Sequence, residues 1–126
     1  MRFRSAPEPF RRFARAVIEI AGWEKETVGV DVRFVERPDD LTQHGPAMIG
    51  GVVYMMRPYW WNDMGAHMLA RTILHEVKHA IDYRSGIFFD LTRDEIEARA
   101  QEVEVLVSEE QALALAQANG LEIEYA

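Results

Sequence analysis

The chain has 126 residues, of which 48% are hydrophobic, and a formal net charge of −7. This length and composition predict one compact domain over residues 1–126 with its own core, and they exclude a largely disordered chain. The acidic balance argues against a general nucleic-acid binder, and the absence of cysteine excludes disulfides and thiolate zinc sites.

The N-terminal residues lack the apolar run of a signal peptide, and no stretch is long enough to span a bilayer. We therefore expect a cytoplasmic protein with no membrane partner and no nucleic-acid partner. Because cysteine is absent, a zinc ion would have to be held by histidine and carboxylate side chains, which form the usual ligand set of catalytic zinc.

Two prolines open the first predicted helix, and Gly22 is a suitable end for it. Its apolar residues recur every three or four positions, namely Phe10, Phe13, Ala14, Val17, Ile18 and Ala21. Residues 28–36 alternate between apolar and polar side chains and are rich in β-branched residues, so they predict a strand. Residues 37–46 predict a loop. A second strand is expected between Gly50 and Met56.

The second half of the chain predicts helices. One helix is expected from a cap at Asn62 or Asp63 to about residue 84. Another begins at Thr92 and extends to about residue 107, and a capping box at Ser108 predicts that the chain then starts a new helix. Residues 121–125 alternate between apolar and acidic side chains and could form a short strand. The order indicates an α+β domain with its strands early and its helices late.

The sequence His75-Glu76-Val77-Lys78-His79 is an H-E-x-x-H motif inside the first of these helices. One helical turn separates the two histidines, so both imidazoles leave the same face and can bind one metal ion. Glu76 projects about 100° away, where it can act as a general base on a water activated by the metal. The motif predicts a zinc-dependent peptidase with one catalytic zinc ion.

Catalytic zinc usually takes three protein ligands, so the two histidines need a partner. No histidine follows His79, and the third ligand must therefore be acidic if it comes from the downstream segment. Thr92 and Glu95 also match a capping box, which gives Glu95 a competing structural role. The candidates downstream of the motif are Asp90, Asp94, Glu95, Glu97 and Glu102.

Residues 75–82 (HEVKHAID), followed by EIEA at residues 95–98, resemble the gluzincin metallopeptidases. The small size is similar to the minimal single-domain kind, the minigluzincins, and the motif is similar to the ImmA-type peptidases. The resemblance implies a zincin-like fold, in which an N-terminal helix and a short sheet accompany a metal-binding helix packed on a glutamate-bearing helix. It implies that His75, His79 and Glu95 bind zinc and that Glu76 is the base.

In the same resemblance, Ala98 matches the small residue that follows the ligand, whereas Arg99 replaces the usual Asp or Asn. Glu97 stands three residues before Ala100 and is the main rival of Glu95. Tyr83, two turns beyond His75, is the predicted catalytic residue that assists the developing oxyanion. Other candidates for this role are Tyr54, His44 and His67. Asp82 is expected either to orient a ligand or to cap the helix end.

The resemblance also implies that the strand between Gly50 and Met56 lies at a sheet edge and pairs with an extended peptide or protein substrate. Two glycines at its start would allow another backbone to approach closely. Trp60 and Trp61 are expected in the core or in the wall of the groove. A further hypothesis is that the tail, residues 121–125, pairs with the same edge and blocks the cleft.

Two other functions compete with the peptidase. One is a zinc-binding domain that recognises a peptide or protein partner without cleaving it. The other is a plain helical structural domain without metal. The presence of Glu76 favours the enzyme, because binding alone does not need a base.

Overall fold

The computed structural model describes residues 1–35, 46–56 and 65–121. Within these residues the chain is α+β, as predicted, with four α-helices and one mixed sheet of four strands. Some predictions fall outside the described residues: the loop from residue 37 to 45, the helix cap at Asn62 or Asp63, the roles of His44, Trp60 and Trp61, and the strand and blocking role of the tail beyond residue 121. The elements in chain order are β1 (Arg2–Arg4), α1 (Glu8–Ala21), β2 (Asp31–Val35), β3 (Ala47–Ile49), β4 (Val52–Met56), α3 (Gly65–Ser85), the 3₁₀-helix η1 (Ile87–Asp90), α4 (Arg93–Glu102), the 3₁₀-helix η2 (Val103–Val105) and α5 (Glu109–Ala118).

The strands lie in the order β1-β2-β4-β3. β1, β2 and β4 are parallel, whereas β3 pairs antiparallel with β4. Gly50 and Gly51 both have positive φ angles, 59° and 85°, so they form the two-residue turn between β3 and β4. The expectation that the segment between Gly50 and Met56 lies at the sheet edge is therefore wrong. β4 is an inner strand, and β3 forms that edge among the described residues.

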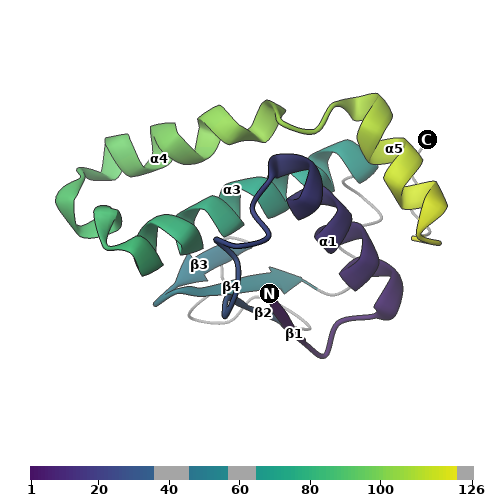
Figure 1. Cartoon of the computed structure of the whole chain (residues 1–126), viewed down its shortest axis with the longest axis horizontal. Coiled ribbons are helices and arrows are strands. Elements are labelled where there is room, and N and C mark those ends of the chain that lie inside the picture. Colours follow the sequence, from purple (N-terminus) through teal and green to yellow (C-terminus); the bar gives the residue numbers. More distant parts are fainter. Residues whose placement is uncertain (36–45, 57–64, 122–126) are drawn as a thin grey trace.

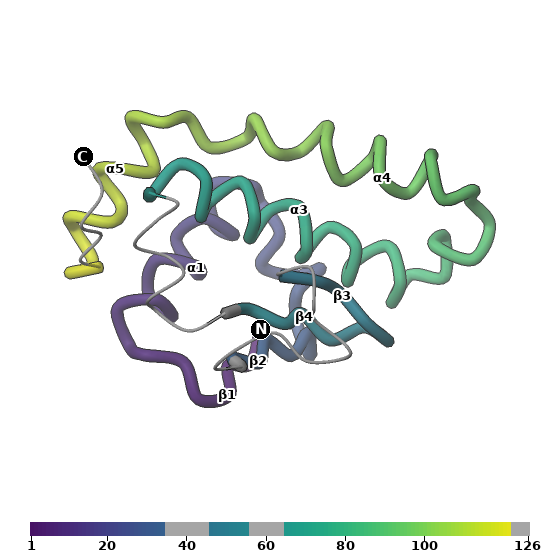
Figure 2. The backbone as a smooth tube through the Cα atoms, turned by 180° about the vertical axis from the view of Figure 1, so that it is seen from behind, coloured from purple at the N-terminus to yellow at the C-terminus, as the bar shows by residue number. Residues whose placement is uncertain are grey.

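Helices α1 and α3 both pack on one face of this sheet, as Figures 1 and 2 show from opposite sides. The predicted apolar stripe of α1 is buried, with Phe10 and Phe13 almost fully enclosed. Alternate residues of the inner strands meet them, because successive side chains of a strand point to opposite faces. The large buried residues of the strands and α3 are Val32, Phe34, Val53, Met55, Leu69, Ile73, Leu74 and Val77.

Helix α4 packs along α3 on the side away from the sheet (Figure 1). Both predicted capping boxes are present, one formed by Thr92 and Glu95 and one by Ser108 and Gln111. The helix predicted to reach residue 107 ends at Glu102 and tightens into η2, so α4 is shorter than expected. Of the helices that the structure describes, none combines the length and the apolar character needed to cross a membrane.

Candidate functional site

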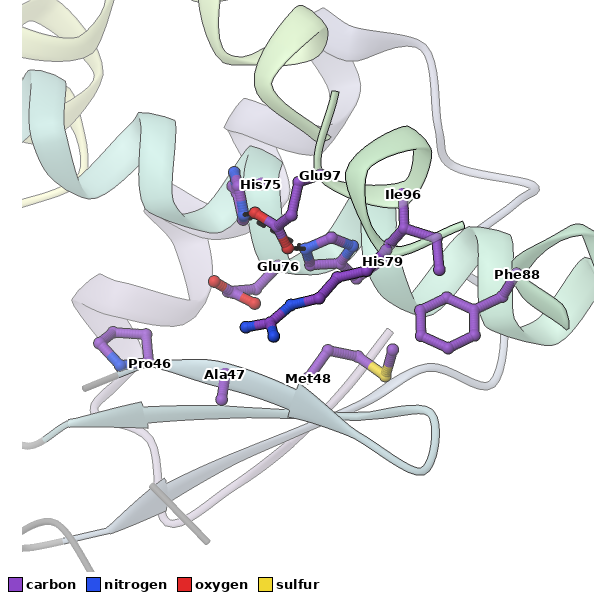
Figure 3. Close-up of a pocket in the computed structure, with 10 residues that line it drawn as sticks. Pro46, Ala47, Met48, His75, Glu76, His79, Phe88, Ile96 and Glu97 are labelled. Atoms are coloured by element: carbon purple, nitrogen blue, oxygen red, sulfur yellow. Dashed lines mark hydrogen bonds and ion pairs between the residues drawn. The ribbon is translucent and has the colours of Figure 1, made fainter. Parts of the chain in front are cut away.

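The two histidines of the motif lie side by side on α3, as the one-turn spacing predicts. Their Nε2 atoms are 3.2 Å apart, and the ring planes stand nearly perpendicular, at 88°. His79 is buried and His75 is half-buried. Both rings line an open cavity of about 650 Å³ between α3, α4 and β3 (Figure 3).

Glu97 of α4 reaches over both rings. Its Oε1 lies 2.9 Å from Nε2 of His79, and its Oε2 lies 3.3 Å from Nε2 of His75 (Figure 3). In a tetrahedral zinc site with bonds of about 2.0–2.1 Å, neighbouring ligand atoms lie about 3.3 Å apart. The three side chains therefore already hold their donor atoms at nearly the spacing that zinc requires.

Glu95 lies two residues earlier on α4 and turns elsewhere, because two residues correspond to about 200° of helical rotation. The Thr92 backbone N–H donates to Oε1 of Glu95 at 2.9 Å, and the Glu95 N–H donates to Oγ1 of Thr92 at 3.2 Å. These hydrogen bonds lower the pKa of Glu95. The structure thus brings Glu97 to the histidines, and it does not bring Glu95 there. This geometry favours Glu97, the rival named from the sequence, over Glu95 as the carboxylate beside the two histidines.

Glu76 also lines the cavity, and one ligand atom each from His75, Glu76 and His79 can lie within 4.8 Å of one another. Burial raises the pKa of Glu76 to about 7; the charge of His75 and a hydrogen bond with the Met48 backbone act against this rise, and the charge of Glu97 adds to it. A carboxyl group that titrates near neutral pH can both accept and release a proton there. Glu76 therefore lies in the cavity beside the histidines and can exchange a proton near neutral pH.

Burial is the main cause that lowers the pKa of His79, and the neighbouring His75 adds to it. The imidazole is therefore kept in its neutral form, which is the form that binds metals. Its Nδ1 atom is buried, and among the described residues it has no hydrogen-bond partner. Nε2, which faces Glu97, is thus the nitrogen of His79 that the cavity presents to a ligand.

Glu104 of η2 orients the other histidine. Its Oε2 lies 3.0 Å from Nδ1 of His75, and Arg71 donates two hydrogen bonds to its Oε1, at 2.8 and 3.1 Å. Burial alone would raise the pKa of Glu104, but the hydrogen bonds from His75 and Arg71 lower it. Such a carboxylate directs Nε2 of the histidine toward a metal.

Sequence reasoning missed Glu104, because the acidic candidates that it considered beside the two histidines ended at Glu102. Glu104 follows Glu97 by seven residues, a spacing that returns to the same helix face. This seven-residue spacing is the feature of the sequence that could have identified Glu104.

Asp82 and Arg99 join α3 to α4. Nε and Nη2 of Arg99 donate to the two carboxylate oxygens of Asp82, at 2.8 and 3.0 Å, and Lys78 lies 3.3 Å from the same carboxylate. Asp82 is only 2% exposed. This pair gives Arg99 a structural role where the resembling families carry Asp or Asn, and it connects α4 to α3 close to the histidines.

Three other predicted residues that the structure describes, Tyr83, Tyr54 and His67, do not line the cavity. The ring of Tyr83 packs against Phe88 and Phe89, and a side chain at Gly51 would meet it at 3.1 Å. Tyr83 therefore lies beside the β3–β4 turn and is absent from the cavity lining. Tyr54 on β4 and His67 on α3 are absent from it as well. The predicted oxyanion role of Tyr83 has no support in this geometry.

Comparisons of the chain with models of known families, with curated proteins and with solved structures found no match. The assignment of a function therefore depends on the site itself.

Proposed function

We propose that this chain is a zinc-dependent peptidase in which His75, His79 and Glu97 bind the metal and Glu76 is the general base. The observation that supports this most is the contact of one Glu97 carboxylate with both Nε2 atoms, at 2.9 and 3.3 Å. Two imidazoles and one carboxylate leave a fourth position open, which is the arrangement of catalytic rather than structural zinc. In this proposal the domain has a zincin-like architecture, with α3 as the metal helix and α4 as the glutamate helix.

Bound zinc would supply a Lewis acid that polarises the carbonyl of the scissile peptide bond. Glu76 takes the proton of the attacking water on its carboxylate and passes it to the leaving amine. Glu104 and Arg71 hold His75 in one tautomer and orientation throughout. The Asp82–Arg99 pair keeps α4 in register, so that Glu97 stays over the histidines.

The edge strand β3 would bind the substrate backbone. Met48 pairs with Val53 of β4, and its backbone is near enough to Glu76 to help lower the pKa of that carboxyl group. The edge strand β3 therefore borders the site. An extended peptide could pair with this edge and carry its scissile bond past Glu76.

The experiment compares zinc content and peptide cleavage in the wild type and three variants: Glu97→Ala, Glu95→Ala and Glu76→Gln. Zinc is measured by mass spectrometry of the purified protein, and cleavage is measured in a mixed peptide pool. We expect the wild type and Glu95→Ala to hold one zinc per chain, and Glu97→Ala to lose it. Glu76→Gln should keep zinc and lose cleavage by about 10²- to 10⁴-fold, the contribution typical of general base catalysis.

Two outcomes would overturn parts of the proposal. Retention of zinc by Glu97→Ala together with its loss from Glu95→Ala would remove Glu97 from the ligand set. Zinc binding without cleavage of any peptide, and without an effect of Glu76→Gln, would instead favour the zinc-dependent recognition domain.

A further inference from the structure

Arg93 also lines the cavity of the two histidines. It is the first residue of α4 and lies one helical turn before Glu97, so both side chains leave the same face of the helix. Glu97 is engaged with the imidazoles. Within residues 1–35, 46–56 and 65–121, the guanidinium of Arg93 takes part in no hydrogen bond or ion pair.

The position of Arg93 is not explained by helix chemistry. The N-terminus of a helix carries a partial positive charge, so a cation in the first turn is unfavourable, whereas Asp94 and Glu95 in the same turn are favourable. The capping box of Thr92 and Glu95 already provides hydrogen bonds to the backbone at the start of α4. An exposed arginine that opposes the helix dipole and faces a cavity indicates a ligand with negative charge.

The formal charges of the site also favour a ligand with negative charge. A zinc ion would contribute +2, and Glu76 and Glu97 contribute at most −1 each, so the sum of these three is not negative. With Arg93, the loaded cavity would carry a charge of at least +1 in a chain whose net charge is −7. The cavity would attract an anionic group that the remaining surface repels.

An apolar corner completes the cavity on the side of His79. Met48 of β3, Phe88 of η1 and Ile96 of α4 come together there, and Figure 3 shows their side chains facing one another beside His79. Phe88 is braced by ring contacts with Tyr83 and Phe89, with centroids 5.6 and 5.7 Å away. This corner has the polarity to receive one large apolar side chain.

We propose that Arg93 and this apolar corner form a subsite for a peptide that carries a large apolar residue next to a carboxylate. The inference rests on the proposed function, because it defines the substrate class of the same site. The carboxylate is either an acidic side chain or the C-terminus of the peptide, since a guanidinium binds both in the same way. Arg93 selects the substrate and takes no part in the proton transfers.

The test measures binding rather than turnover. The zinc-loaded Glu76→Gln protein is titrated with fluorescein-labelled peptides that contain one Phe among Ala and Ser, and anisotropy is recorded. One peptide set carries Glu or Gln on either side of Phe, with an amidated C-terminus. The other set has no acidic side chain and ends just after Phe, with a free acid or an amide. The test variant combines Glu76→Gln with Arg93→Gln. The matched control combines Glu76→Gln with Arg4→Gln, because Arg4 is an exposed arginine on β1 at the opposite sheet edge.

We expect the carboxylate peptide of at least one set to bind about tenfold more tightly than its neutral partner, as for one charged hydrogen bond. The preference should disappear with Arg93→Gln and persist with Arg4→Gln. The set that discriminates identifies the source of the carboxylate. Equal binding within both sets, or a preference that survives Arg93→Gln, would overturn the subsite alone. A protein that takes up no zinc would overturn the proposed function and the subsite with it.

Discussion

The two sides of helix α3 are built from different chemistry. The side toward the sheet and α1 is apolar, and Leu69, Leu74 and Val77 are almost completely buried there. The side toward α4 and η2 is a polar seam, in which Glu97 contacts both histidines, Glu104 contacts His75 and Asp82 contacts Arg99. The first side holds the domain together by burial, which needs neither metal nor charge. The second places charged groups next to one another, which a bound cation would stabilise.

One observable separates the two sides, namely the increase in the free energy of unfolding that saturating zinc produces. A metal that binds only the folded state adds stability according to its affinity. A change on the apolar side should lower total stability and leave this zinc increment intact. A change in the polar seam should reduce the increment itself.

The largest loss of stability is expected for Leu74→Ala. Leu74 is fully buried on the apolar side, and such a truncation typically costs about 2–5 kcal/mol. Urea denaturation with and without zinc should show equal losses in both states. A loss confined to the zinc-loaded protein would contradict the division between the two sides.

A smaller loss, of about 1–3 kcal/mol, is expected for Asp82→Asn, because Arg99 keeps a hydrogen-bond acceptor and is itself partly exposed. Zinc affinity should also fall, since the pair aligns α4 on α3. Burial would raise the pKa of Asp82, but the hydrogen bonds and charges of Arg99 and Lys78 lower it below its ordinary 3.8.

The lowered pKa of Asp82 determines how the stability difference between the wild type and Asp82→Asn depends on pH. A carboxylate with a depressed folded-state pKa stabilises the protein above its unfolded-state pKa, and this contribution is lost as the pH falls through the folded-state value. The stability difference between the wild type and Asp82→Asn should therefore be full at neutral pH and disappear in strong acid. A difference that grows with acidity would contradict the role of the Asp82–Arg99 pair.

Glu104→Gln should weaken zinc binding by about 10- to 100-fold, which is typical when the carboxylate behind a ligating histidine is removed. The zinc-free protein should lose less stability than Leu74→Ala does. Competition with a fluorescent chelator measures the affinity. The matched control is Glu102→Gln, an exposed glutamate of the same acidic run, and it should leave zinc affinity unchanged.

The smallest effect is expected for Glu95→Ala. This side chain is exposed and accepts the Thr92 N–H in the cap of α4, so thermal unfolding should shift slightly to lower temperature. The zinc increment should stay at its wild-type value. A large drop in the increment would return Glu95 to the ligand set.

Local signals in the sequence were sufficient for the helices. The apolar stripe of α1, the motif on α3 and the capping boxes at Thr92 and Ser108 each depend on residues within one or two turns of one another. β1 and β3 were missed, because each has only three residues and is stabilised by partners elsewhere in the chain. The glycines at 50 and 51 were interpreted as the start of an edge strand, whereas their positive φ angles form a hairpin turn.

The site shows the same difference between local sequence signals and contacts between distant parts of the chain. His75, Glu76 and His79 share one helix, so their convergence followed from the period of that helix. The choice between Glu95 and Glu97 depends on how α4 is rotated against α3, and this rotation depends on contacts across the two helices such as that between Asp82 and Arg99. The capping box at Glu95 was visible in the sequence, and it indicated correctly that this carboxylate was already engaged. The resemblance to known families outweighed it.

The most direct test of the central claim is a crystal structure of the zinc-loaded protein, with anomalous diffraction recorded at the zinc absorption edge. The account predicts one anomalous peak about 2.0–2.2 Å from Nε2 of His75, Nε2 of His79 and a carboxylate oxygen of Glu97. A peak bound by Glu95, or no peak between α3 and α4 in crystals grown with saturating zinc, would contradict it.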